Sequence, residues 1–407
     1  MLILLGILLI GILTFISTHR DIDILHPSVL FSVIILSSYF VACLHLSDLQ
    51  SEYPIDFTLL ILSLILAFIA GGKFSNLIKW NPKNVDVQYK SSVMQLVCFL
   101  LWSGILISFI VEVLVLGAPP AISMAIRSEY FLSLWGSIVI LQSVFAGLLF
   151  YDRYNQNVVG KLFWVYALTI IIIDGLLANK YQIISLGLIF LIAYNSYKRR
   201  IRIKILFVGI GMIILLFLVL FEFVYQEMYG ITIDMIYNIY QMNIPREFEI
   251  LTQPYLYVAF NYDNLYNFLS NSHDSFYGLK TLNGFLSIVG IDQFYLSTQQ
   301  LISSEWHSIL TIESLTAGTM FEDPAQDGDI PFMILFTFLC GIWSSASYKK
   351  FIYNRGFFAF FMFASISCAI FMSFFYNAFT SKITLLNLLA AYCINIVLNK
   401  TSKARSI

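Results

Sequence analysis

Long apolar runs alternate with short polar connections along most of the chain. Several runs reach the ~18 residues that a helix needs to cross a bilayer. The pattern therefore predicts an all-α polytopic membrane protein with about eleven transmembrane helices. The sixth and seventh runs are short and joined by the turn LANK, so a fused or re-entrant pair is an alternative to two spans. The runs lie near residues 1–18, 27–46, 56–78, 91–116, 130–151, 162–177, 181–196, 203–224, 331–348, 356–376 and 382–399.

One large polar segment interrupts the apolar pattern and divides the chain into three regions. Residues 1–224 hold the first eight predicted helices, residues 225–330 form the polar segment, and residues 331–407 hold the last three. Within the segment, YLYVAFNYDNLYNFLS (255–270) has helical spacing of its apolar residues. We expect an amphipathic helix there, lying along the membrane surface with its aromatic rings at headgroup depth. The residues that share its apolar face are Tyr255, Ala259, Tyr262, Tyr266 and Leu269.

Composition agrees with a membrane protein. Hydrophobic residues make up 59% of the chain and charged residues 12%, against about 25% charged residues in soluble domains. All five cysteines lie inside apolar runs, so no disulfide framework is indicated. The first run lacks a basic preceding region and an A-x-A cleavage site, so we interpret it as a retained helix.

Lysine and arginine predict the orientation. With the N-terminus outside and the C-terminus in the cytoplasm, 18 of the 23 Lys and Arg residues fall in the inner segments. The 225–330 segment is then on the outer face. It carries 13 acidic residues and two basic ones. A long translocated segment is often acidic without a functional reason, so this charge alone indicates no ligand.

A few cations remain on the predicted outer side. Arg127 follows the Pro-Pro turn in LGAPPAISMAIR, and Lys180 lies in a short turn; Arg246, Lys280 and Lys382 are the others. Each is interpreted either as a solubilising charge or as a ligand for an anion at the headgroup plane. An arginine offers a two-pronged contact to phosphate, and a lysine offers a point charge.

Acids and histidines supply further candidates. Glu112, Asp174 and Glu222 lie in or against apolar runs, where ionisable groups are costly and are functional candidates by default. Pairing with a neighbouring cation or reaching the interface is the alternative for each. His273, beside Asp274, and His307 are candidate general bases or ordinary hydrogen-bonded loop residues.

Other chemistry is weakly indicated. The run FEDPAQDGDIP has several acids but lacks the ligand spacing of an EF-hand, so we expect no metal. The chain has no HExxH, P-loop or GxSxG motif. The basic inner stretch YKRRIRIK is interpreted as membrane anchoring rather than nucleic-acid binding.

Four stretches together resemble the Wzy-type O-antigen polymerases, which join oligosaccharide repeat units in bacteria. The resemblance covers roughly two thirds of the chain. It departs from the family pattern at Lys180, where Arg is expected, and at DGDIP, which replaces Asp-x-Gly-x-x-Gly. The matching stretches are LGAPP with the downstream Arg127, GLLANKYQIISLGLIFLIAY with KRRIRIK, YLYVAFNYDNLYNFLSNSHDSFYGLKTLNGFL, and TMFEDPAQDGDIPFMILFTFLCG.

The resemblance implies a metal-independent glycosyltransferase of GT-C-like architecture in the bacterial inner membrane, without a cofactor. It would move a growing glycan from undecaprenyl diphosphate to another lipid-linked repeat unit, building O-antigen, capsule or exopolysaccharide. A chain-length regulator and a flippase are the implied protein partners, with no nucleic acid. Cations are needed at the diphosphate and a base at the acceptor hydroxyl. The implied diphosphate ligands are Arg127, Lys180, Arg246 and Lys280, and the implied bases are His273, His307 and Asp274.

Two other functions remain open. An O-antigen ligase uses the same donor but a different acceptor, and one large outer segment fits both enzymes. A flippase for lipid-linked oligosaccharides typically has internal repeats, which this sequence lacks.

Overall fold

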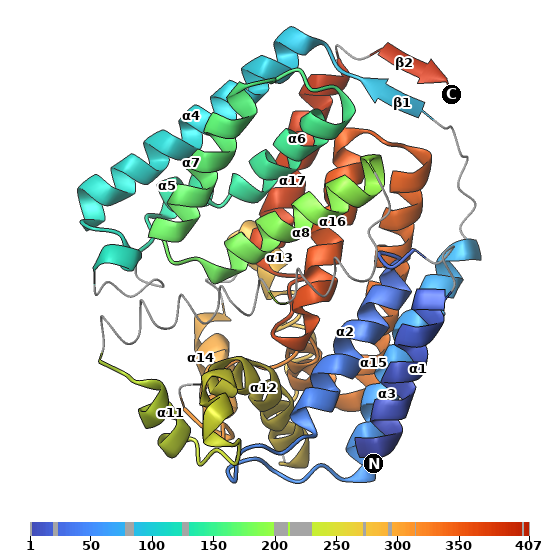
Figure 1. Ribbon diagram of the computed structural model, residues 1–407, viewed down its shortest axis with the longest axis vertical. Coiled ribbons are helices and arrows are strands. Elements are labelled where there is room, and N and C mark those ends of the chain that lie inside the picture. Colours follow the sequence, from blue (N-terminus) through green and yellow to red (C-terminus); the bar gives the residue numbers. More distant parts are fainter. Residues whose placement is uncertain are drawn as a thin grey trace. The chain divides into compact units, whose positions relative to one another are not determined.

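The structure is a computed structural model in which helices form nearly all of the regular structure (Figure 1). It describes the chain apart from residues 1, 19–22, 78–84, 124–129, 199–210, 212–229, 272–273, 292–294, 314, 401–402 and 407. The helices are α1 (Leu2–Thr18), α2 (Pro27–Ala42), α3 (Ile55–Phe74), α4 (Ser91–Leu116), α5 (Ser133–Val139), α6 (Gln142–Asn155), α7 (Leu162–Leu176), α8 (Lys180–Tyr197), α11 (Ile233–Ile239), α12 (Thr252–Ser270), α13 (Asn283–Ile288), α14 (Leu296–Ser308), α15 (Glu322–Tyr353), α16 (Phe357–Phe371) and α17 (Lys382–Asn399).

The chain folds into two units, each built from three separate stretches. The first unit comprises residues 1–79, 231–348 and 369–385, and the second comprises residues 80–230, 349–368 and 386–407. In the first unit, α2 packs against α1, α3 and α12. In the second, α4, α6, α7 and α8 pack against one another, and α5 packs on α4 (Figure 1).

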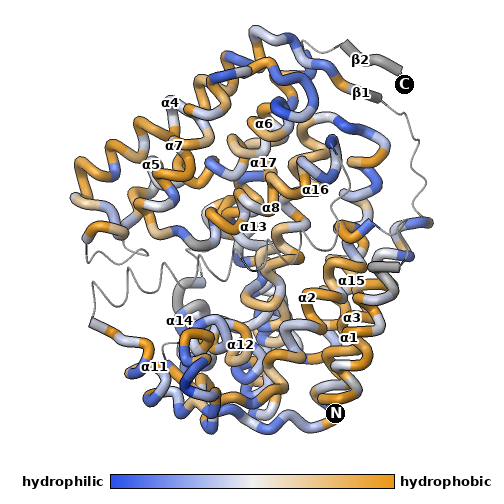
Figure 2. The backbone as a smooth tube through the Cα atoms, viewed as in Figure 1, coloured by the Kyte–Doolittle hydropathy of each residue, from blue (hydrophilic) through white to orange (hydrophobic). Residues whose placement is uncertain are grey.

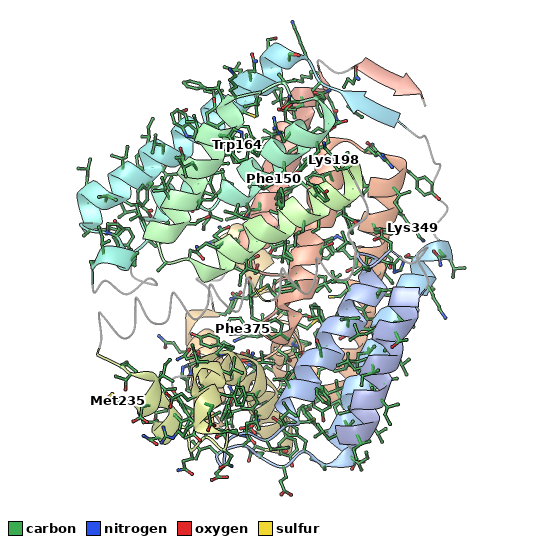
Figure 3. All side chains as sticks on the ribbon, viewed as in Figure 1. Phe150, Trp164, Lys198, Met235, Lys349 and Phe375 are labelled. Atoms are coloured by element: carbon green, nitrogen blue, oxygen red, sulfur yellow. The ribbon has the colours of Figure 1, made fainter. Side chains whose placement is uncertain are left out.

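The long helices identify an all-α membrane protein. Within the described residues, six helical stretches are long and apolar enough to span a bilayer, one of them α5 and α6 taken together (Leu134–Asn155), and four more helices are apolar but shorter. Their tubes are predominantly hydrophobic in Figure 2. Large apolar side chains on these helices face outward; Trp164 on α7, labelled in Figure 3, is 67% exposed. The count of eleven spans and the GT-C-like architecture remain predictions, and the predicted eighth helix, 203–224, lies outside the described residues apart from Gly211.

The predicted helix at 130–151 is two helices, α5 and α6, separated at residues 140–141. Polar groups gather at this break. The buried Ser143 hydroxyl donates to the Gln182 side chain at 2.6 Å, and the Gln182 amide donates to the Ile140 carbonyl at 3.5 Å. A break in an apolar helix frees backbone groups that must find partners inside the protein. Gln182 of α8 supplies a hydrogen-bond partner for the Ile140 carbonyl.

A two-stranded sheet belongs to the second unit and was not predicted. Strands β1 (Val85–Gln88) and β2 (Lys403–Ser406) pair antiparallel, with Val85 opposite Ser406. Next to β1, the Tyr89 hydroxyl accepts a hydrogen bond from the Phe357 amide at 2.9 Å. The sheet therefore connects the last residues of the chain to the segment that precedes α4.

Helices α3 and α15 cross at glycines in the first unit. A methyl group on Gly71 would lie 2.0 Å from the Phe338 carbonyl oxygen, and one on Gly341 would lie 2.1 Å from the Phe68 carbonyl oxygen. Small residues at a crossing let the two backbones approach, which is how helices associate where lipid offers no hydrophobic driving force. The crossing of α3 and α15 therefore has room only for glycine at these two positions.

Helix α12 is covered by protein, which corrects the expectation of a surface helix with its rings among headgroups. The run from Phe260 to Leu265 is buried without interruption, so both faces of the helix contact protein. Tyr262 donates or accepts a 2.7 Å hydrogen bond with Ser38 of α2. The helix itself is confirmed. Its aromatic residues pack the interior of the first unit.

Asp263 on α12 fixes the connection between α2 and α3. Its carboxylate accepts a hydrogen bond from the Ser51 amide at 2.8 Å and another from the Thr311 hydroxyl. Burial raises the pKa of this carboxyl above its ordinary value of 3.8, although both hydrogen bonds act in the opposite direction.

We expect the alanine variants of Gly71 and Gly341 to lose thermal stability, because each methyl group meets a backbone carbonyl that cannot move aside. Overpacking costs about 1–3 kcal/mol. The matched control is Gly187→Ala on α8, where nothing lies within 4 Å of the added carbon. The measurement is the midpoint temperature at which monodisperse protein disappears from size exclusion in detergent. Equal midpoints for all three variants would contradict the crossing.

We also expect Asp263→Asn to remove a pH dependence of stability. A raised native pKa means that the carboxyl favours folding below pH ~3.8 and that this contribution is lost as the pH rises through the native pKa. The melting temperature of the wild type relative to Asp263→Asn should thus fall with rising pH and then level off. A difference that stays constant between pH 4 and pH 7 would count against this assignment.

Candidate functional site

Two asparagines on α12 hold the segments that carry the candidate site. Asn264 donates both amide hydrogens, to the Leu315 carbonyl at 2.7 Å and the Ala317 carbonyl at 2.9 Å. Asn261 donates to the Phe374 carbonyl at 3.0 Å. A buried amide is costly unless it is hydrogen-bonded, so these contacts fix the backbone just before α15 and just after α16. Phe375, labelled in Figure 3, stacks on Tyr257 of α12 with ring centroids 5.8 Å apart.

Two carboxylates occupy the first turn of α15. Glu322 accepts hydrogen bonds from the Gly318 amide at 3.0 Å and the Gln326 side chain at 3.1 Å. Asp323 accepts one from the Asn377 side chain at 2.9 Å. Acidic groups are favourable at a helix N-terminus because the first backbone amides there lack carbonyl partners. The sequence thus places negative charge where the helix tolerates it.

The turn formed by residues 276–281 is clamped onto the same part of α15. The buried Asp327 carboxylate accepts from the Lys280 amide at 3.0 Å and from the Thr281 amide at 2.7 Å. The Phe276 amide donates to the Gln326 carbonyl at 3.1 Å, and the Tyr277 amide donates to the Asp327 carbonyl at 3.0 Å. These four hydrogen bonds, which we call the Asp327 clamp, therefore hold the turn in one position. Directly after Asp327, the helix breaks at Gly328 and Asp329 and then continues to Tyr353.

The clamp brings Lys280 to both carboxylates. Its ammonium nitrogen lies 3.7 Å from Glu322 Oε1 and 4.0 Å from Asp323 Oδ1. The three side chains are 27%, 14% and 21% exposed, so a ligand can reach them. We call Lys280, Glu322 and Asp323 the Lys280 centre. Its distances exceed the ~2.7–2.9 Å of a direct charge-assisted hydrogen bond, so the ammonium keeps donor capacity for another oxygen.

The Lys280 centre suits neutral polar groups better than anions. Two carboxylates and one ammonium carry a formal charge of −1 when all are ionised, which repels a phosphate. A hydroxyl can accept from the ammonium and donate to a carboxylate, and the carboxylate can take its proton as a general base. Within the described residues, no three His, Cys, Asp or Glu side chains converge as metal ligands.

Arg246, a predicted diphosphate ligand, is bonded to local acids. Its guanidinium donates to Asp234 and lies 3.4 Å from Glu249, and it also donates to Asn238 at 3.0 Å. The same group stacks on the Tyr237 ring at 4.0 Å. A diphosphate at this arginine would have to compete with two carboxylates.

The predicted bases divide between described and undescribed residues. His307 is exposed on α14, and its Nδ1 lies 2.6 Å from the Ser303 carbonyl, to which a protonated Nδ1 donates. Asp274 is exposed. His273 lies outside the described residues.

Of the predicted intramembrane acids, two are described and both are buried in the second unit. Glu112 on α4 accepts a hydrogen bond at 3.1 Å from the Leu132 amide, which precedes α5, and so connects these two helices. Asp174 is fully buried near the end of α7. Lys180 is the first residue of α8, and its side chain lies outside what the structure describes, as do Arg127 and Glu222.

The other residues of the Lys280 centre have little signature in the sequence. Glu322 and Asp323 stand out only as part of an acidic run, and no sequence pattern marks Asn377 or Gln326. The acidic run beside a helix start was the one feature that pointed to this place. Its pairing with Lys280, more than forty residues earlier, depends on the clamp at Asp327.

Comparison with protein-family models, curated proteins and solved structures gives no match to this chain. The all-α membrane fold rests on the helices described above. The resemblance to the Wzy-type polymerases remains a prediction from the sequence.

We expect Asp327→Ala to release the 276–281 turn, because two backbone amides lose their acceptor. A buried donor left without a partner costs about 1–3 kcal/mol. Asp327→Asn, which keeps one acceptor oxygen, should lose less stability. Thermal unfolding and limited proteolysis in the turn measure the two variants side by side. Unchanged cleavage in Asp327→Ala would show that the clamp does not hold the turn.

Proposed function

We propose that the protein is a membrane glycosyltransferase that polymerises undecaprenyl-diphosphate-linked oligosaccharide repeat units. The sequence resemblance suggests the reaction, and the Lys280 centre supplies a described site with suitable chemistry. The proposal places this centre on the outer face of the bacterial inner membrane, with the N-terminus outside and the C-terminus in the cytoplasm. No cofactor or metal is required in this scheme.

The observation that carries the proposal is the course of α15. The helix begins with the two carboxylates of the Lys280 centre, breaks at Gly328 and Asp329, and continues as an apolar helix long enough to span a bilayer. An outward-facing apolar stripe follows the break directly. A polar centre that leads into an apolar stripe suits a substrate with a sugar head and a long hydrocarbon tail. The exposed residues of the stripe are Ile330, Ile334, Leu335 and Leu339.

The reaction assigns separate tasks to the two ends of the substrate. The acceptor hydroxyl oxygen forms a bond to the anomeric carbon of the donor glycan, and the bond from that carbon to the diphosphate oxygen breaks. The electron pair leaves with undecaprenyl diphosphate, and the hydroxyl proton passes to a base. In this proposal Glu322 or Asp323 is the base. Developing negative charge on the leaving group calls for fixed cations, and the sequence resemblance alone implies Arg127 and Lys180 for this task.

Deleting the protein in its native strain tests the function. Surface and lipid-linked glycans would be separated by size. Single repeat units on the surface without a ladder of longer chains would establish a polymerase. Full-length chains retained on the carrier lipid would indicate a ligase instead, and unexported single repeats a flippase. An unchanged ladder would exclude a role in glycan assembly.

Complementing the deletion strain with single variants tests the residues. We expect Lys280→Ala and Arg127→Ala each to reduce chain growth by about 10²-fold or more, the effect of losing one preorganised polar group. Arg246→Ala should retain chain growth, because local acids already neutralise this arginine. Membrane fractions probed for the protein control for insertion. Wild-type ladders from Lys280→Ala at normal expression would remove the Lys280 centre from the reaction.

A further inference from the structure

Tyr277 has an unusual combination of backbone and side-chain properties. Its ring is 89% exposed, although its backbone amide is held by the Asp327 carbonyl. Tyr277 and Gly278 have φ values of +52° and +94°, and the Leu279 amide donates to the Phe276 carbonyl at 3.1 Å. This is a tight turn whose two central residues both have positive φ, a position for which Asn-Gly is the favoured pair.

A tyrosine in place of asparagine carries a conformational cost. Positive φ is unfavourable for a bulky side chain, and such strain persists where the surrounding structure imposes it and concentrates at functional sites. The four hydrogen bonds of the clamp impose it here. The structure therefore holds a large aromatic ring away from the protein on a rigid base, three residues before Lys280.

Two buried oxygen atoms beside the Lys280 centre have no hydrogen-bond partner among the described residues. Gln326 is 1% exposed, and its Oε1 has no hydrogen-bond partner among the described residues while its amide nitrogen donates to Glu322. The hydroxyl of Thr281, which is 4% exposed and follows Lys280, is also without a described partner. Buried polar groups normally have partners, so a hydroxyl that reached these two atoms would meet hydrogen-bonding groups that the described residues do not use.

We infer that Tyr277 and the Lys280 centre form one sugar-binding subsite. The ring stacks on the face of a pyranose, whose hydroxyls donate to Glu322 and Asp323 and accept from the Lys280 ammonium. The formal charge of the centre disfavours a phosphate headgroup and accepts a neutral polyol. The identity of the sugar rests on the proposed function: it is the non-reducing sugar of the acceptor repeat unit, with its reacting hydroxyl at a carboxylate.

The test uses full-length protein in detergent and the lipid-free repeat-unit oligosaccharide cleaved from the strain's own polysaccharide. Binding is measured by saturation-transfer NMR and titration for wild type, Tyr277→Phe and Tyr277→Asn. Phenylalanine keeps the ring and should bind like wild type. Asparagine removes the ring but suits the turn, so we expect an equal or higher melting temperature with binding weaker by about three- to tenfold, as for one aromatic contact.

Phe248→Asn is the matched control, since Phe248 is a 55% exposed aromatic on the 3₁₀ helix η4 (Arg246–Leu251) of the same unit. It should bind like wild type. Wild-type affinity in Tyr277→Asn, or no binding by the wild-type protein, would overturn the subsite. So would a drop in binding that Phe248→Asn shares, since a general interfacial role of aromatic rings then explains it.

The glycan ladder separates this inference from the proposed function. If chain growth requires the protein but Tyr277→Asn supports normal ladders and binding, the subsite is wrong and the function stands. If deletion leaves the ladder unchanged while the purified protein binds the oligosaccharide through Tyr277, the polymerase is wrong and the sugar-binding subsite stands.

Discussion

The first unit depends on the hydrogen bonds that Asn264 makes inside the protein. Helix α12 is buried on both faces. Its polar side chains cannot hydrogen-bond to solvent there and must bond to other protein groups. The side-chain nitrogen of Asn264 meets this requirement by donating to two carbonyls of the stretch before α15, and that of Asn261 donates to the Phe374 carbonyl after α16. The chemistry at the start of α15 is therefore positioned by a helix that contributes no charge to the Lys280 centre.

The centre also shows how one helix accommodates two environments. The first turn of α15 carries carboxylates that are stabilised by amides from Gly318, Gln326 and Asn377. The remainder of the helix crosses α3 at Gly341 with no room for a side chain. The break at Gly328 and Asp329 separates the polar first turn from the part of the helix that packs against α3. Without it, the polar turn would have to follow the axis that the glycine crossing imposes.

Local patterns in the sequence predicted most of the helices. Ten of the eleven predicted runs are helical in the described residues, because apolar length alone identifies a helix in this kind of protein. Two features of the helices were not predicted. The run at 130–151 is interrupted where Gln182 of α8 supplies a partner for the Ile140 carbonyl. The helix at 252–270 is buried by protein, and periodicity does not distinguish protein from lipid as the neighbour of an apolar face.

The candidate site was predictable only in part. Lys280 was identified because cations are scarce on the predicted outer side, a property visible in the sequence. Its partners were not, because the pairing with Glu322 and Asp323 is set by the Asp327 clamp between distant segments. Arg246 was identified for the same reason as Lys280, yet it lies among acids from its own neighbourhood. The sequence shows where the cations lie along the chain, but only the fold shows which acidic groups each cation contacts.

The interleaving of the two units sets the order in which the protein can mature. The first unit needs residues 369–385, and the second needs residues 386–407, so neither unit is complete before these residues are made. Strand β1 is made long before its partner β2. Helix α3 likewise enters the membrane long before α15 arrives to cover its glycines. During synthesis, β1 and the glycine face of α3 therefore exist for a time without the partners that cover them in the folded protein.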